Sequence, residues 1–417
     1  MKYLLHFTLV LFVSVFTFAQ ETKQVLFLGN SYTQAHNLPV LVSEMAASTG
    51  DELIFDSHTP GGFRFMNHVS NATSLSKISD RDWDFVVLQE QSQLPSFPLP
   101  QVQQNVFPYA EQLTELIRAN NPCTIPVFFN TWGRKNGDQQ NCPNFPTLCT
   151  YEGMDDLLQE RYRTMAEDNF ALIAPVAAVW RHIRANHPDF ELYTSDGSHP
   201  SLLGSMAAAY TFYTIIFQKN PQNVSYTQSL TDQQAQILKN TVHDVVFQHL
   251  EQWFIGEHDN FAHFTTTFHE TSGIQFNPSF PFSNNFTWDF GDGNSSHQLQ
   301  PIHQFSAEGT YLVTLTVNTC DDTFTYTIPV QVSNLATQES PISAIKVYPN
   351  PAKDILYIDQ VNANYIRIVD SAGKVVHAAF STQSGNTLVH CAHLPAGLYH
   401  LIMVEGDKRH RVSFLKK

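Results

Sequence analysis

Three residues of this chain have the types and spacing needed for nucleophilic catalysis. Ser31 lies shortly after an apolar run at residues 25–28, and Asp196 and His199 lie close together on one segment far downstream. A serine hydroxyl is a weak nucleophile until a base takes its proton, and a histidine oriented by a carboxylate is such a base. We therefore interpret Ser31 as a nucleophile, His199 as its general base and Asp196 as the residue that orients the imidazole.

The elements that must position these residues alternate between strand-like and helix-like stretches. Short apolar runs lie at residues 25–28, 53–56, 85–88, 126–129 and 172–174. Stretches with helical spacing lie at residues 38–49, 102–120, 154–169, 202–218 and 232–254. Such alternation predicts an α/β domain with a parallel sheet covered on both faces, whose ligand site lies beyond the carboxyl ends of the strands. Ser31 would then lie at the mouth of the sheet.

Three sequence blocks resemble those of the SGNH (GDSL-like) hydrolases. Residues 29–32 resemble the first block, with Asn30 where the family usually has Asp; residues 59–62 resemble the second block; and residues 196–201 match the last. The resemblance covers about residues 24–220. It implies a carboxylic ester hydrolase with a flavodoxin-like three-layer fold and neither a lid nor a cofactor. It also implies that the backbone N–H groups of Ser31 and of Gly61 or Gly62 stabilise the oxyanion.

The family's third block is the one that this sequence lacks. That block normally supplies an Asn amide to the oxyanion hole after the third strand, but here the run at residues 85–88 leads into Gln89 and Gln91. A Gln amide can do the same work with one more methylene, and Gln89 is favoured because its path back to Ser31 is shorter. Gln91 and Asn130, after the fourth apolar run, are its rivals.

The N-terminus predicts export. Lys2, an apolar run at residues 4–18 and a cleavage point after Ala19 form a signal peptide, since the run is shorter than the ~20 residues of a membrane span. No later segment is apolar enough to serve as a transmembrane anchor. In an oxidising compartment one bridge among Cys123, Cys142 and Cys149 is expected; Cys142–Cys149 is the simplest of three pairings, and the sequence alone does not choose.

Downstream of residue 257 the sequence changes to short strands and turns. Residues 262–333, with a Trp-Asp-Phe-Gly-Asp-Gly segment at 288–293, resemble a PKD domain, which is an immunoglobulin-like β-sandwich. Residues 344–417, with Tyr-Pro-Asn-Pro at 348–351, resemble the C-terminal sorting domain of type IX secretion, here expected as a small β-sandwich. We therefore divide the chain into a signal peptide (1–19), a hydrolase domain (20–258), a PKD domain (262–333), a linker (334–343) and a sorting domain (344–417).

These features together predict a secreted or surface-attached serine esterase that reaches the outside through the periplasm. Its expected partners are the type IX secretion machinery and a polysaccharide that carries acyl or acetyl esters. Two alternatives stay open: a lipase or lysophospholipase, and a non-catalytic glycan-binding or adhesion protein. The net charge of −15 argues against a nucleic-acid partner, because such binding needs a basic surface. Trp132 is expected to pack in the core rather than to form a platform for a sugar.

The sorting domain can be tested by deletion. Removal of residues 344–417 should leave ester hydrolysis intact but hold the protein in the periplasm of a host with type IX secretion, because the sorting motifs lie apart from Ser31, Asp196 and His199. Fractionation of such a host, with the full chain as the control, measures the distribution. Normal surface delivery of the truncated chain would assign the tail another role.

Overall fold

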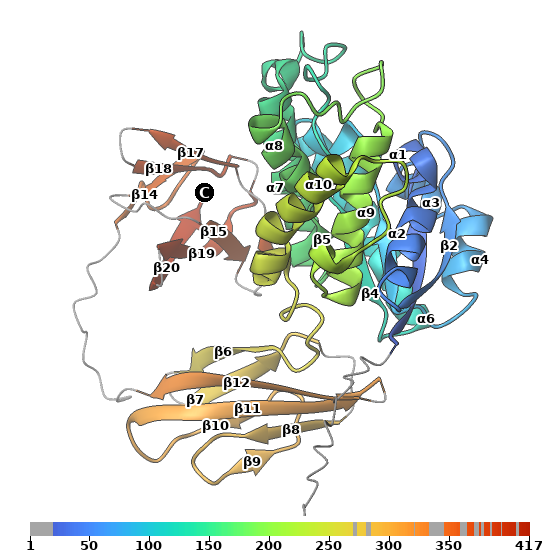
Figure 1. Cartoon of the computed structure of the whole chain (residues 1–417). Helices are drawn as coiled ribbons and strands as arrows, with labels where there is room; N and C mark the ends of the chain where they lie inside the picture. The colour runs from blue at the N-terminus through green and yellow to red at the C-terminus, as the bar shows by residue number, and fades with distance from the viewer. Residues whose placement is uncertain are drawn as a thin grey trace, which may run out of the picture. The chain divides into compact units, whose positions relative to one another are not determined.

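A computed structural model of the chain describes residues 20–269, 273–280, 285–320, 322–332, 346–358, 365–370, 375–376, 379–383, 386–392, 394–405 and 408–417. The expected signal peptide (1–19) and linker (334–343) lie outside the described residues. The chain separates into two compact units, the first ending at Asp259 and the second beginning at Asn260. Figure 1 labels many of the helices and strands of the two units.

The first unit is built on a five-stranded parallel sheet with the strand order β2-β1-β3-β4-β5. Its strands are β1 (Thr22–Leu28), β2 (Glu52–His58), β3 (Phe85–Leu88), β4 (Ile125–Phe129) and β5 (Leu172–Ala174). All five expected strands are present. Val25, Leu26, Phe27 and Leu28 are at most 1% exposed, as a strand covered on both faces requires. This strand order is that of the flavodoxin-like folds, which confirms the predicted fold class.

Helices form a layer on each face of the sheet (Figure 1). The helices are α1 (Ser31–Gln34), α2 (Leu38–Ala47), α3 (Phe65–His68), α4 (Ala72–Ile78), α5 (Leu99–Asn105), α6 (Phe107–Asn120), α7 (Tyr151–Asp168), α8 (Val176–Asn186), α9 (Leu202–Phe217) and α10 (Asp232–Val245). On one face α2 packs on α9, which is backed by α8 and α10; α4, α6 and α7 pack together against the other. Because all five strands are parallel, the connections that follow them leave the sheet at the same edge.

Several helices differ from the sequence prediction, including α3 and α4, which were not predicted. The expected helix at residues 102–120 is divided between two helices, α5 and α6. Val106 lies between them, and Pro108 stands in the first turn of α6. The expected helix at 232–254 ends at Val245 and gives way to the 3₁₀ segment η5 (Phe247–Trp253). Helix α8 was not predicted, although its buried Val176, Val179, Trp180 and Ile183 have helical spacing.

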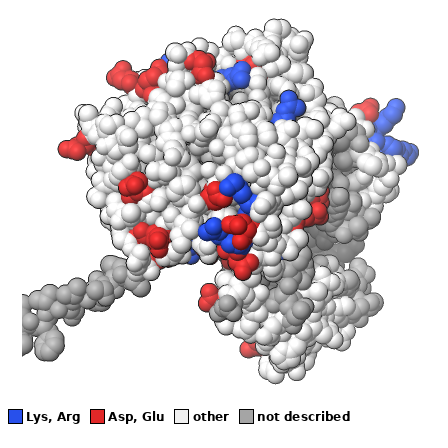
Figure 2. Space-filling view, turned by 90° about the vertical axis from the view of Figure 1, so that its right-hand side faces the viewer, with Lys and Arg blue, Asp and Glu red and all other residues white. Residues whose placement is uncertain are grey.

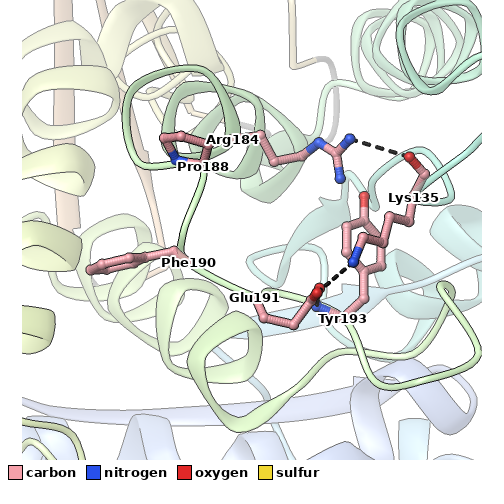
Figure 3. Close-up of a pocket in the computed structure, with 6 residues that line it drawn as sticks. All are labelled: Lys135, Arg184, Pro188, Phe190, Glu191 and Tyr193. Carbon is pink, nitrogen blue, oxygen red and sulfur yellow. Dashed lines mark hydrogen bonds and ion pairs between the residues drawn. The ribbon is translucent and has the colours of Figure 1, made fainter.

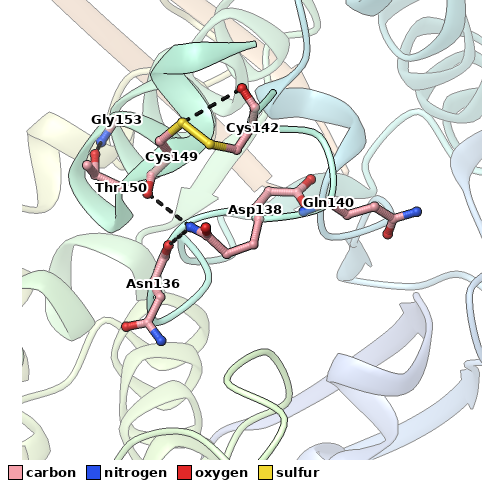
Figure 4. The surroundings of a disulfide bond; sticks show 8 residues. Asn136, Asp138, Gln140, Cys142, Cys149, Thr150 and Gly153 are labelled. Carbon is pink, nitrogen blue, oxygen red and sulfur yellow. Dashed lines mark hydrogen bonds between the residues drawn. A yellow bond between two sulfur atoms is a disulfide. The ribbon is translucent and has the colours of Figure 1, made fainter. Parts of the chain in front are cut away.

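A disulfide closes the long excursion that follows β4. Cys142 and Cys149 are bonded, which confirms the simplest pairing (Figure 4). The buried carboxylate of Asp138 lies in the same excursion and accepts hydrogen bonds of 2.7 Å from the side chains of both Asn141 and Gln93. Since Gln93 follows β3, Asp138 ties the excursion after β4 to the loop after the neighbouring strand.

The second unit contains two separate all-β parts, as predicted. The first comprises β6 (Phe264–His269), β7 (Gly273–Pro278), β8 (Phe286–Asp289), β9 (Ser295–Ser296), β10 (Ile302–His303), β11 (Gly309–Thr319) and β12 (Asp322–Val332). These strands form the sheets β10-β7-β6 and β12-β11-β8-β9 around a fully buried Trp288.

The other all-β part consists of two four-stranded sheets, β13-β14-β18-β17 and β16-β15-β19-β20. Its strands are β13 (Val347–Tyr348), β14 (Ile355–Ile358), β15 (Tyr365–Asp370), β16 (Val375–Val376), β17 (Ala379–Gln383), β18 (Asn386–His390), β19 (Gly397–Glu405) and β20 (Lys408–Lys416). Its core includes Leu356, Val389, Leu401 and Phe414.

Charged residues make up only 15% of the chain. On the face that Figure 2 shows they are scattered, and no broad basic patch gathers there, in keeping with the net charge of −15. Among the described residues, no helix combines the length and the apolar character that a membrane crossing needs.

Candidate active site

Ser31 is the first residue of α1 and directly follows a tight turn, Gly29–Asn30, that leaves β1. The turn is capped by Asn30, whose side-chain oxygen accepts a hydrogen bond of 3.2 Å from the backbone N–H of Tyr32. A Cβ on Gly29 would approach Thr33 Oγ1 to 2.5 Å and Gln89 Oε1 to 2.8 Å, so only glycine fits here. The chain thus leaves the sheet and enters the helix within two residues, with Ser31 at the sheet's carboxyl edge.

The tertiary structure brings Ser31, His199 and Asp196 into one hydrogen-bonded series. Ser31 Oγ lies 2.9 Å from His199 Nε2, and His199 Nδ1 lies 2.6 Å from Asp196 Oδ2. This network assigns the proton to Nδ1, which donates to the carboxylate, and leaves Nε2 to accept from the serine hydroxyl. The side chains of His199 and Asp196 are 42% and 48% exposed, so both are accessible to solvent.

Asp196 also shapes the loop that carries it. Its Oδ1 accepts hydrogen bonds from the backbone N–H groups of Ser198 and His199, at 2.8 and 2.9 Å, and from the Thr194 hydroxyl at 2.9 Å. Burial alone would raise the pKa of Asp196, but the hydrogen bonds from His199 and from the loop N–H groups outweigh it and hold this pKa well below its usual range. The Asp196 carboxylate is therefore ionised at neutral pH and can accept the Nδ1–H of His199.

A hollow of about 190 Å³ adjoins this loop (Figure 3). Lys135 and Glu191 form an ion pair in its wall, and Arg184 donates a 3.2 Å hydrogen bond to the Lys135 carbonyl while lying 3.9 Å from the Tyr151 ring centroid. The backbone N–H of Lys135 donates to the Gly197 carbonyl at 2.9 Å. Lys135 therefore connects the wall of the hollow, through its ion pair with Glu191 and its carbonyl bond to Arg184, to the loop at Gly197.

Residues 60–63, which include most of the second block, form a turn that is tied to the segment of Ser31. The Phe63 N–H donates to the Pro60 carbonyl at 3.1 Å, and Gly62 has φ +73°, which suits a turn that needs glycine at its third position. Asn30 Nδ2 donates to the Phe63 carbonyl at 2.9 Å and so ties this turn to the nucleophile. Among the described residues, no group accepts a hydrogen bond from the N–H of Ser31, Gly61 or Gly62.

The structure places the three candidate amides of the missing block differently from expectation. Gln89, favoured from the sequence, is fully buried: its oxygen accepts from the Asn30 N–H at 3.0 Å and from the Thr33 hydroxyl at 2.9 Å, and its nitrogen donates to the Glu90 carbonyl. Both ends of this amide are engaged inside the protein, which argues against Gln89 as an oxyanion donor. Gln89 instead stabilises the turn before Ser31 through its bonds to Asn30 and Thr33.

The two rival amides differ in exposure. Asn130 is 3% exposed and donates to the adjacent Thr131 carbonyl at 3.2 Å. Gln91 is half-buried, and its oxygen accepts from the backbone N–H groups of Gln93 and Leu94 at 2.8 and 3.1 Å. Two bonds therefore fix the oxygen end of Gln91, so that its nitrogen, which also donates to Gln93 Oε1 at 3.1 Å, is the end left for a further acceptor.

Two buried residues below the site were not singled out from the sequence. Glu90 accepts hydrogen bonds from the N–H groups of Gln91 and Phe65; burial raises its pKa to about 8 although these bonds oppose the shift. His68 donates from Nε2 to the Gly29 carbonyl at 3.0 Å and bonds through Nδ1 to Ser74 Oγ at 2.8 Å. Local spacing gives no signal for either residue. Within the described residues, no three His, Cys, Asp or Glu side chains gather as a metal site would require.

Comparisons with known proteins identify the downstream domains and the kind of protein that the first unit resembles. Residues 262–333 match the PKD domain, and residues 346–417 match the secretion system C-terminal sorting domain. The sorting domain indicates type IX secretion to the cell surface or the outside. The predictions of both domains are thereby confirmed. A comparison with curated proteins finds no match.

Solved structures resemble the N-terminal part of the chain. A DUF4886 family protein from Bacteroides uniformis is 18% identical, with a TM-score of 0.47, over 54% of this chain and 94% of its own. A protein from Slackia heliotrinireducens assigned to the SGNH hydrolases is 29% identical, with a TM-score of 0.39, over 46% and 98%. An acetyl xylan esterase is 17% identical, with a TM-score of 0.34, over 46% and 99%.

The buried His68 predicts a pH dependence of stability. Burial lowers its pKa to about 4, an effect that the Gly29 carbonyl opposes and His58 reinforces. In the unfolded chain the pKa is about 6.5, so below that pH the unfolded state binds one more proton than the folded state. The free energy of unfolding should fall by up to ~1.4 kcal/mol per pH unit between about pH 6.5 and pH 4 because of this residue.

Melting temperatures of the wild type and of His68→Asn, measured across this range, check that prediction. The variant should be less stable at neutral pH, and the difference from the wild type should shrink as the pH falls. His249→Asn, which changes a histidine with a 45% exposed side chain, is the matched control and should run parallel to the wild type. Parallel curves for His68→Asn as well would contradict a neutral, buried His68.

Proposed function

We propose that the first unit is a serine hydrolase of carboxylic esters that acts at the cell surface or outside the cell. One observation carries the proposal: the unbroken series from Ser31 Oγ to His199 Nε2, at 2.9 Å, and from His199 Nδ1 to Asp196 Oδ2, at 2.6 Å. This is the arrangement that turns a serine hydroxyl into a nucleophile.

The proposed reaction uses each of these atoms in turn. Ser31 Oγ attacks the ester carbonyl carbon while His199 Nε2 takes the hydroxyl proton, and Asp196 stabilises the imidazolium through Nδ1–H. His199 then returns the proton to the departing alcohol, which leaves an acyl group on Ser31. Water, deprotonated by the same imidazole, attacks the acyl carbon, and Ser31 leaves with the proton that His199 holds.

The developing oxyanion needs donors beside Ser31. The N–H groups of Ser31 and of Gly61 or Gly62 fit this role because no group among the described residues accepts from them. Gln91 is the side-chain donor that its half-buried position and fixed oxygen favour, in place of Gln89.

A polysaccharide carrying acyl groups such as acetyl is the proposed substrate class. A long acyl chain needs an apolar cavity to bury it, whereas here the base and its carboxylate are 42% and 48% exposed. An open site of this kind admits a bulky polymer, and export places the enzyme where such polymers are found. Hydrolysis rates on acetylated glycans, short p-nitrophenyl esters, long-chain p-nitrophenyl esters and phospholipids test this choice; preference for the long-chain esters or phospholipids would contradict it.

The proposed roles of Ser31 as nucleophile, His199 as base and Asp196 as the carboxylate that orients it can be tested by substitution. Ser31→Ala and His199→Ala should remove nearly all turnover of p-nitrophenyl acetate without unfolding the protein. Asp196→Asn should lower kcat by up to ~10⁴, because the imidazole loses its charged partner and its fixed tautomer. Ser195→Ala, an exposed serine on the same loop, is the control and should keep wild-type kcat. Substantial activity in Ser31→Ala would refute the proposal.

A second set of variants tests the oxyanion donor. Gln91→Ala should lower kcat by ~10²–10³ with little change in KM, as loss of a side-chain donor does. Gln89→Ala should instead lower the melting temperature, because it leaves the buried Asn30 N–H and Thr33 hydroxyl without their acceptor. Asn130→Ala serves as the third arm. If kcat falls tenfold in neither Gln91→Ala nor Asn130→Ala, the oxyanion hole consists of backbone N–H groups alone.

A further inference from the structure

Three buried aromatic rings are stacked behind the loop that carries the base. Tyr32 stacks on Trp132 with ring centroids 4.9 Å apart and planes inclined by 4°, and Trp132 stacks on Trp180 at 3.7 Å and 8°. None of the three is more than 3% exposed, so the expectation that Trp132 packs in the core is confirmed. This aromatic column runs from α1, through the segment after β4, to α8.

The polar atoms of Tyr32 and Trp132 both bond to Ser198. The Tyr32 hydroxyl lies 2.6 Å from Ser198 Oγ, and Trp132 Nε1–H donates to the Ser198 carbonyl at 3.1 Å. The Tyr32 ring also meets the His199 imidazole edge to face, with centroids 5.3 Å apart. Burial raises the pKa of Tyr32, against hydrogen bonds from Ser198 and Ser92, so the hydroxyl stays neutral. Ser198, which directly precedes His199, is thus bound through its side chain and its backbone.

These contacts bear on how the loop of Asp196 and His199 is held in position relative to Ser31. The side chains of Asp196 and His199 are half-exposed, so packing against neighbouring side chains restrains them on one side only. A displacement of about 1 Å between nucleophile and base costs up to ~10² in rate. Tyr32 directly follows Ser31, so one short segment carries both the nucleophile and a group that holds the base loop.

We propose that Tyr32 and Trp132 are positioning residues that hold His199 in register with Ser31 by fixing Ser198. The inference rests on the proposed ester hydrolysis and adds to it two residues that neither form a bond to the acyl group nor transfer a proton. Their effect passes through Ser198 to the imidazole. It should therefore appear in kcat, which depends on the position of the base, and not in KM.

Variants that remove single hydroxyls test this inference. Tyr32→Phe keeps the ring stack and removes one side of the bond to Ser198; Ser198→Ala removes the other side. Each should lower kcat for p-nitrophenyl acetate by about tenfold with KM and melting temperature little changed, since one neutral hydrogen bond is lost. The double variant should be no slower than Tyr32→Phe, because the bond that Ser198→Ala removes is already lost in Tyr32→Phe. Tyr210→Phe, which removes a buried hydroxyl bonded to the Tyr226 carbonyl at 3.0 Å, should keep wild-type kcat.

A second readout does not depend on turnover. The imidazole Nδ1–H that bonds to Asp196 should give a downfield proton resonance, identified by its absence in His199→Ala, and this resonance should broaden or shift in Tyr32→Phe and Ser198→Ala. Wild-type kcat and an unchanged resonance in both variants would overturn the inference, as would losses that multiply in the double variant. If the wild type neither hydrolyses esters nor reacts with a fluorophosphonate at Ser31, the proposed function fails, while the resonance still tests whether Ser198 holds the imidazole.

Discussion

A group of buried hydrogen bonds around Asn30 and Gln89, next to Ser31, is the interaction on which the rest of the candidate site depends. Asn30 uses both ends of its amide: the oxygen accepts from the Tyr32 N–H and the nitrogen donates to the Phe63 carbonyl. Gln89 accepts from the Asn30 N–H and from Thr33. Because unpaired polar groups are costly in an apolar core, these bonds lock the connections after β1, β2 and β3 to one another.

This group of hydrogen bonds also gives a physical reason for Asn at position 30, where the SGNH family usually has Asp. A carboxylate could cap α1 equally well, since capping needs only an acceptor. It could not donate to the Phe63 carbonyl, and so it would not tie down the turn that presents Gly61 and Gly62. The Asn30 amide therefore joins the segment of Ser31 to the turn of Gly61 and Gly62, which carry the proposed oxyanion donors. It does so without burying a charge.

The two halves of the proposed triad are held by different means. Ser31 is fixed from within the core by buried amides, by His68 and by the close fit of Gly29. Asp196 and His199 lie on a half-exposed loop, which is held by its own carboxylate, by the hollow behind it and by the aromatic column. Because of this division, Asp196 and His199 can be half-exposed while the contact between Ser31 and His199 is maintained. All three residues come from the first unit, so the sorting domain serves export without contributing to the triad.

The sequence by itself determined the five strands, the α/β class, the β-rich downstream domains and the candidates Ser31, Asp196 and His199. Short apolar runs fix strands wherever both faces are buried, and Asp196 and His199 are close enough in the chain to share a loop. Only the tertiary structure decided that Gln89 points into the core while Gln91 lies half-exposed, because side-chain direction is no longer set by strand alternation once the chain leaves β3. Tyr32 and Ser198, 166 positions apart, meet for the same reason: packing of α1 against the loop before α9 creates that contact, and no local pattern encodes it.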